Sequence, residues 1–278
     1  RYRFEPKQAV HYKVTQKMSI SSQRGRVTQT ASSDWTTYKH IRVASVDDEG
    51  NVTLETTIDR ILATLQFGDE KPHSYDSESD DNPPAPLQET CRTIGKPLAL
   101  MKFSPRGTLI STEMLQRGEN AGQPAAANEE EDGSNNKSFL IALPEVPVRV
   151  GESWRDPLTV NVSVPPKLET PITLGRTYTL KGVADGIATI ELVTTVLTPV
   201  NNPAIMAQLI SLTPAGTIRF DMRKGLIVGK TLRSDETVYE FAGPGSKMRA
   251  DNAMVETVVD RPRVAARPDA EIGPPAAR

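Results

Sequence analysis

The sequence is poor in the residues that build disulfides and metal centres. Its 278 residues include one cysteine and three histidines. The single cysteine, Cys91, cannot form an internal disulfide, so cysteine content does not reveal the redox compartment. The histidines His11, His40 and His73 lack the close spacing of a zinc-binding helix. Residue spacing therefore predicts no metal site.

Motifs of catalysis and cofactor binding are also missing from the sequence. There is no G-x-S-x-G nucleophile elbow, and no set of nucleophile, base and orienting residue stands out. The stretch GPGSK at residues 243–247 lacks the spacing of a phosphate-binding loop. We therefore expect no enzymatic activity, no catalytic residues and no cofactor.

Basic charge, aromatic residues and long apolar runs are equally scarce. The formal net charge is -2, which does not supply the basic surface that nucleic-acid binding requires. Aromatic residues make up 5% of the chain, too few to suggest a cleft lined with sugar-stacking rings. No stretch approaches the roughly 18 apolar residues of a membrane-spanning helix, so we expect this part of the protein not to cross a membrane.

The regular pattern that the sequence does have is a period of two in apolar and polar residues. In GIATIELVTTVL, the side chains of Ala188, Ile190 and Leu192 fall on one face, and the other face is mostly threonine and glutamate. NVTLETTIDRIL and GTIRFDM alternate in the same way. Such segments, rich in β-branched residues, predict half-buried antiparallel strands. FDMRKGLIVGKTL additionally predicts a hairpin that turns at residues 223–225.

Helical signal is limited to short stretches. PAPLQETCRTIG fits two helical turns, and NKSFLIALPE fits either a short helix or a strand. We therefore expect an all-β, mainly antiparallel protein with one or two short helices.

Composition divides the chain into two predicted units, residues 1–117 and 137–260. The acidic, alanine-rich residues 118–136 predict a flexible linker, and the proline-, alanine- and arginine-rich residues 261–278 predict a disordered tail. Residues 68–96 form an acidic, proline-containing excursion within the first unit.

Two similar turns, SPRGTL at residues 104–109 and TPAGTI at residues 213–218, suggest an internal repeat. The segments that begin at Tyr38 and Tyr178 also correspond, and one insertion, the excursion, reconciles both matches. Chance recurrence of proline–glycine turns is the alternative explanation. The repeat predicts two related curved-sheet or half-barrel-like units.

A curved sheet must cover its apolar face. Two such sheets can cover each other, which is the simpler arrangement, and an apolar or lipid-like ligand can also do so. Four residues are weak candidates for interaction: Trp35, Trp154, Tyr75 and Asp76. The tryptophans fit core anchors better than ligand-stacking rings. The acidic run around Asp76 fits a solvated loop better than a calcium site, because it lacks the twelve-residue calcium-loop pattern.

Several longer motifs remain, and they carry a family resemblance. They are LPEVPVRVGESW, YTLKGVADGIATIEL, GTIRFDMRKGLIVGKTL and SKMRADNAMVETV, with YRFEPKQAVHYKVTQKMSI and the YDS that starts at Tyr75. Together they resemble a family of exported bacterial proteins of unknown function that is common in planctomycetes. The resemblance implies a β-rich, often lipoprotein-like protein of the periplasm or cell envelope, and it implies no catalytic residue. Since Cys91 is internal, any lipid anchor is expected upstream of Arg1.

The leading hypothesis is therefore a non-enzymatic cell-envelope protein that binds or scaffolds, holding an apolar or lipid-like ligand. The alternative is a structural or assembly subunit of a surface protein complex. Such a subunit would contact envelope protein partners through strand edges.

Overall fold

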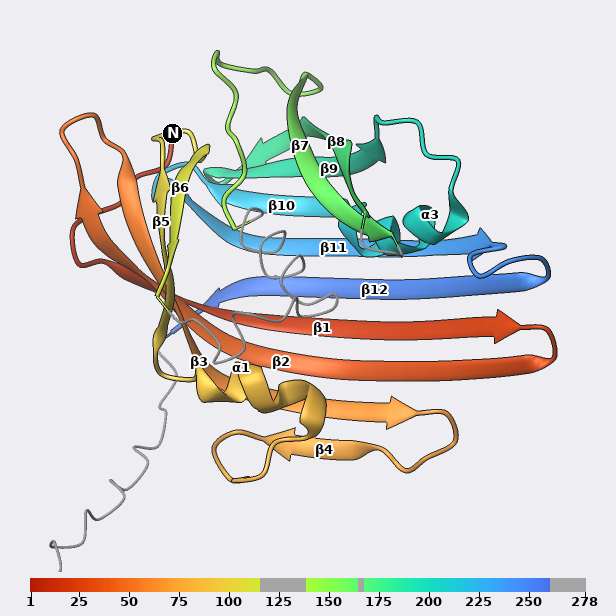
Figure 1. The fold of residues 1–278 in the computed structure, drawn as a ribbon. Helices are drawn as coiled ribbons and strands as arrows, with labels where there is room; N and C mark the ends of the chain where they lie inside the picture. The colour runs from red at the N-terminus through yellow and green to blue at the C-terminus, as the bar shows by residue number, and fades with distance from the viewer. Residues whose placement is uncertain (116–138, 165–167, 261–278) are drawn as a thin grey trace, which may run out of the picture.

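Twelve strands form one curved antiparallel sheet in the computed structural model, which describes residues 1–115, 139–164 and 168–260 (Figure 1). In chain order the strands are β1 (Ala9–Arg24), β2 (Val27–Val46), β3 (Val52–Phe67), β4 (His73–Asp76), β5 (Pro97–Phe103), β6 (Leu109–Met114), β7 (Ser153–Val164), β8 (Leu168–Ala184), β9 (Ile187–Val196), β10 (Ala215–Asp221), β11 (Leu226–Tyr239) and β12 (Ser246–Val259). The prediction of an all-β, antiparallel protein is confirmed.

Two short helical segments accompany the sheet in the described part of the chain. The first consists of the 3-10 turn η1 (Ala85–Leu87) and helix α1 (Gln88–Arg92), where the sequence predicts two helical turns. The second consists of α3 (Pro203–Leu209) and the 3-10 turn η2 (Ile210–Leu212), which the apolar pattern did not predict. Asn202 caps α3, since its Oδ1 accepts a hydrogen bond of 2.9 Å from the backbone N–H of Ala204. None of the described helices is long and apolar enough to cross a membrane.

The strand order is β6-β5-β3-β2-β1-β12-β11-β10-β9-β8-β7, with β4 paired to the far part of β3. Because the order begins at β6 and ends at β7, the sheet curves without closing. β1 and β12 pair from His11↔Val259 to Arg24↔Ser246 and so join the strands of the two predicted units edge to edge. The division into two units stays a prediction, and the predicted linker and tail, residues 118–136 and 261–278, lie outside the described residues.

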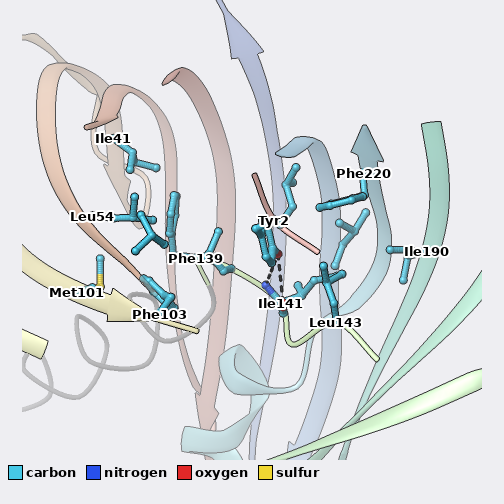
Figure 2. Packing of buried hydrophobic residues seen from close by; sticks show 14 of the residues in the cluster. Tyr2, Ile41, Leu54, Met101, Phe103, Phe139, Ile141, Leu143, Ile190 and Phe220 are labelled. Carbon is cyan, nitrogen blue, oxygen red and sulfur yellow. Dashed lines mark hydrogen bonds between the residues drawn. The ribbon is translucent and has the colours of Figure 1, made fainter. Parts of the chain in front are cut away.

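The concave face of the sheet, here called the inner face, carries the main hydrophobic core at one end. Strands from both halves contribute, including Ile41, Leu54, Ile190 and Phe220. Residues 139–143 run across this face as an irregular segment that fills the space between the two halves (Figure 2). The stretch that fits a short helix or a strand in the sequence is therefore neither of them where it is described.

Tertiary hydrogen bonds replace secondary structure in this segment. The Tyr2 hydroxyl donates to the Ile141 carbonyl at 3.1 Å and accepts from the Ile141 N–H at 3.0 Å. The Leu143 N–H donates to the Arg106 carbonyl at 2.8 Å. Because these partners satisfy the buried backbone, the segment needs no neighbouring strand.

Each helical segment covers one flank of the inner face. α1 and its neighbours cover a cluster on β3 and β4 that contains Ile61, Ala63, Leu65, Tyr75 and Leu87. On the other flank, α3 packs on β7 and β8 through Ile205 and Leu209 against Val162, Ile172 and Leu174. Figure 1 shows α1 and α3 on the same side of the sheet, at opposite flanks.

The two similar turns lie in different structural settings. Gly107 lies in the hairpin between β5 and β6 with a φ of 87°, whereas Gly216 lies inside β10 with a φ of 156°. A Cβ on Gly107 would collide with Tyr2 and Ile141, and a Cβ on Gly216 would collide with the backbone of Thr231. Both glycines permit a close approach, although they do not occupy equivalent corners.

Gly107→Ala should strongly destabilise the protein, because it adds left-handed backbone strain and a collision with the Tyr2–Ile141 contact. We expect the free energy of unfolding, measured by urea denaturation, to fall by about 2–5 kcal/mol. Gly25→Ala is the matched control: its φ is 59°, and no atom lies within 4 Å of the added Cβ. The control should lose only about 1–2 kcal/mol. Equal losses in the two variants would contradict this account of the core.

Candidate functional site on the inner face

Beyond the core, the inner face of β11, β12, β1 and β2 continues between the two helical flanks. The pairing registers arrange its side chains in three rows across the strands. The rows are Leu232, Met254, Gln16 and Trp35; then Ser234, Asn252, Met18 and Ser33; then Glu236, Ala250, Ile20 and Ala31. We call these twelve positions the inner-face strip.

The strip combines five large, partly buried apolar or aromatic side chains with two alanines and five polar side chains. Met18, Ile20, Trp35, Leu232 and Met254 are all only partly buried, in contrast to the fully packed core. Among the polar side chains, Gln16 Nε2 donates a hydrogen bond of 3.1 Å to Asn252 Oδ1 across the β1–β12 pair. Because the two amides bond to each other, an apolar partner can cover them without breaking this hydrogen bond.

Three charged residues mark the boundary between the strip and the core. Lys230 Nζ lies 3.2 Å from Glu256 Oε1, and Lys39 Nζ lies 2.9 Å from Glu256 Oε2. Lys230 and Glu256 are about as buried as the core, with 5% and 4% of their side chains exposed, while the Lys39 side chain is 21% exposed. Lys230 also donates to the Phe139 carbonyl at 2.9 Å.

The charges in this cluster stabilise one another in an apolar setting. Both lysine ammonium groups lie over the Phe139 ring, 5.6 and 5.8 Å from its centroid. Burial alone would raise the pKa of Glu256, but the two ammonium groups outweigh it and lower that pKa to about 2. Burial lowers the pKa of Lys230, and Glu256 opposes this shift. Among the described residues, the cluster holds two lysine side chains and one carboxylate.

The structure places the four candidate interaction residues in three different settings. Trp35 lies in the first row of the strip and packs on the cluster beneath α1. Tyr75 is buried in that cluster. Trp154 packs at the core end, where its Nε1 donates to the Ala142 carbonyl at 2.7 Å and its ring stacks on Tyr178. Their roles in binding stay predictions.

Asp76 is engaged within its own loop. Arg60 Nε donates to Asp76 Oδ1 at 3.0 Å, and this hydrogen bond lowers the pKa of Asp76. Glu78 also pairs with Arg60, and Asp80 accepts a hydrogen bond from the Asp76 N–H. These contacts hold the acidic loop against β3.

Sequence reasoning missed the charged cluster and most of the strip. The signal that could have found it is alternation. Lys230 is in phase with Leu232, and Glu256 is in phase with Met254, so each charge occupies an inner-face position. A charged residue in phase with apolar neighbours indicates a buried ion pair or a functional site. Only the β11–β12 register shows that Lys230 and Glu256 are partners.

Comparison with known proteins gives limited matches. The model of a family of unknown function, DUF6263, matches residues 125–227, which is less than half of the chain. This agrees with the expected likeness to a domain of unknown function. No curated protein matches the chain.

Among solved structures, the chain is similar to lipovitellin, in a structure that describes its lipid–protein interactions. The TM-score is 0.51 at 10% identity, over 96% of this chain and 27% of that chain. This chain therefore spans about a quarter of the lipovitellin chain, and the likeness is one of fold.

Two further structures match with TM-scores too low to support an argument. One is a β-barrel-like protein of the domain of unknown function DUF1849 from Brucella abortus, with a TM-score of 0.20 at 10% identity, over 92% of this chain and 100% of that chain. The other is the MucA/MucB complex of Pseudomonas aeruginosa, with a TM-score of 0.13 at 8% identity, over 88% and 89%.

Glu256→Gln should destabilise the fold strongly, because it leaves two ammonium groups without their carboxylate at the edge of the core. We expect the free energy of unfolding at neutral pH to fall by about 3–5 kcal/mol in urea denaturation. Glu191→Gln is the matched control, since its partner Lys181 and Glu191 itself are about half exposed. The control should lose less than about 1 kcal/mol. Similar losses in both variants would show that the cluster is not a structural requirement.

The same carboxylate should make stability depend on acid. Because the pKa of Glu256 falls from 4.5 to about 2 on folding, its contribution is complete above pH 4.5 and is lost as the pH falls towards 2. Between these values the free energy of unfolding of the native sequence should fall more steeply with decreasing pH than that of Glu256→Gln. Parallel pH profiles for the two proteins would contradict the assignment.

Proposed function

We propose that this protein is a non-enzymatic binding protein that holds an apolar or lipid-like ligand on the inner-face strip. The observation that carries the proposal is the incomplete cover of this face by the described residues. Residues 139–143 fill the core end, and the helical segments cover the flanks, yet apolar side chains between them stay partly exposed. A partly exposed apolar surface on a rigid sheet is typical of an interaction site.

The composition of the strip suits an apolar chain better than a rigid ring. Met18 and Met254 are unbranched and adaptable, so they can follow a flexible partner. The fold likeness to lipovitellin, a protein described with its lipid–protein interactions, supports the same class of ligand. The sequence motifs that resemble an exported bacterial family support an envelope or periplasmic location as part of the proposal.

The charged cluster suggests the orientation of the ligand. Lys39 is the most exposed member and lies where the strip meets the core. An acidic head group next to Lys39 would pair with its partly exposed ammonium group, while the apolar chain extends towards Met18 and Ile20. We therefore propose a single-chain amphiphile with an acidic end as the best-matching ligand.

A separate hollow of about 450 Å³ is less suitable for such a ligand. Most of its lining residues are polar or charged and include Lys17, Asp34, Arg233 and Asp251. By strand alternation these four side chains lie on the outer face, opposite the strip.

Met254→Glu should weaken binding, because it places a carboxylate in the floor of the strip. Loss of one methionine contact is worth about 1.5–3 kcal/mol, so we expect at least about a tenfold increase in the Kd of a fluorescent fatty acid. Val255→Glu is the matched control, since Val255 is the next residue on β12 and faces outward with 42% exposure. The control should bind as the native sequence does.

Native mass spectrometry of protein purified from its source tests the proposal independently. A retained apolar molecule that Met254→Glu loses would support it. Failure of the native protein to bind fatty acids, or equal weakening by Met254→Glu and Val255→Glu, would contradict it.

One observation also supports the assembly hypothesis. β6 ends the sheet, and Ile110 and Met114 on it are 52% and 47% exposed. An unpaired strand edge with exposed apolar side chains can add a strand from a partner. If assembly is the function, sedimentation should show association that Ile110→Lys abolishes, whereas a monomer at high concentration would count against it.

A further inference from the structure

A second group of functional side chains gathers on the outer face of the same strands. His11 on β1 and His40 on β2 are directly paired across the two strands, and their rings lie 5.3 Å apart. Asp59 on β3 reaches both of them. His40 Nδ1 lies 2.8 Å from Asp59 Oδ1, and His11 Nδ1 lies 3.9 Å from Asp59 Oδ2.

A β-bulge brings Asp59 to this position. Tyr38 pairs with Arg60 and Lys39 pairs with Ile58, so Asp59 is an extra residue without an opposite partner on β2. A bulge re-aims a side chain out of the regular alternation, and bulges are frequent next to functional sites. Here the bulge directs the carboxylate towards two histidines on the neighbouring strands.

We propose that His11, His40 and Asp59 bind a divalent transition-metal ion of the zinc class. Two imidazoles and one carboxylate form a donor set that zinc accepts, with water as the fourth ligand. The three ligand atoms lie within 4.8 Å of one another. The site lies on the opposite side of the sheet from the inner-face strip and does not depend on the proposed ligand.

The distances are close to those of an assembled centre. With zinc–ligand bonds near 2.0–2.2 Å, tetrahedral ligand atoms lie about 3.3 Å apart. The separations of 2.8 and 3.9 Å, each to a different oxygen of Asp59, bracket this value, and all three ligand atoms lie within 4.8 Å of one another. Asp59 Oδ2 is buried, and no hydrogen bond reaches it, which leaves this oxygen suited to a cation.

Exposure and proton balance are consistent with an open metal position. The side chains of His11, Asp59 and His40 are 17%, 14% and 23% exposed, so water can reach the fourth position. A carboxylate only accepts hydrogen bonds, so His40 Nδ1 carries the proton in its contact with Asp59. Zinc bound at His40 Nδ1 takes the place of this proton, and the neutral imidazole then carries its one proton on Nε2.

Zinc titration of the metal-free, tag-free chain by calorimetry tests the proposal. We expect one zinc ion per chain. His11→Ala and Asp59→Asn should each raise the zinc Kd by at least about 10- to 100-fold. Changes to residues that only hydrogen-bond to a metal ligand already have effects of that size, and these variants change a proposed ligand itself. His73→Ala is the matched control, because His73 is an exposed histidine on β4 outside the cluster.

Two further measurements separate metal binding from structural damage. Saturating zinc should raise the thermal midpoint of the native sequence and of His73→Ala, but not that of the cluster variants. Cobalt as a spectroscopic probe should give visible absorption that His11→Ala removes. The proposal is overturned if the native chain does not bind zinc. It is also overturned if folded His11→Ala and Asp59→Asn bind as tightly as the native chain, or if His73→Ala loses as much affinity as they do.

Discussion

The pairing of β1 with β12 is the contact on which the rest of the structure depends. It joins the first and last strands in chain order, which lie side by side in the middle of the sheet, along almost their whole length. Each half of the sheet would otherwise expose its inner face, because the core needs Ile41 and Leu54 from one half and Ile190 and Phe220 from the other. The two strands are separated by nearly the whole described chain, so bringing them together costs loop-closure entropy. The apolar burial that their pairing makes possible must offset this cost.

This one constraint creates an inner face with two parts. At the core end, Tyr2 and residues 139–143 fill the space between the halves through paired hydrogen bonds and apolar contacts (Figure 2). Further along the long strands, the described residues cover the sheet only with the two helical segments, which lie on its flanks. The Lys39–Glu256–Lys230 cluster lies where the two parts meet, and this boundary is the basis of the proposed amphiphile site.

Strand alternation places a second chemistry on the other side of the same strands. Tyr12 points inward and donates to the Ile227 carbonyl, whereas its neighbour His11 points outward to His40 and Asp59. The backbone of β1 and β2 thus separates the inner face from the outer cluster of His11, His40 and Asp59, whose side chains are of the kinds that bind metal ions. Because the two sets of side chains are on opposite faces, substitutions in one can be designed without touching the other.

The sequence by itself determined the local structure of this protein. Alternation in β3, β9 and β10, the hairpin after Asp221 and the turns of η1 and α1 were all predictable, since each depends on near neighbours. α3 was missed because seven residues that begin with proline carry little periodic signal, and residues 139–143 were ambiguous because tertiary hydrogen bonds decide their path. Among the candidate residues, Trp35 could be recognised from the sequence because a large aromatic side chain predicts a packing anchor. The sequence could not show that Lys230 contacts Glu256 or that His11 lies near Asp59. Only the tertiary structure decided which strands are neighbours, in which register and with which bulge, because these long-range pairings come from the shared core rather than from local preference.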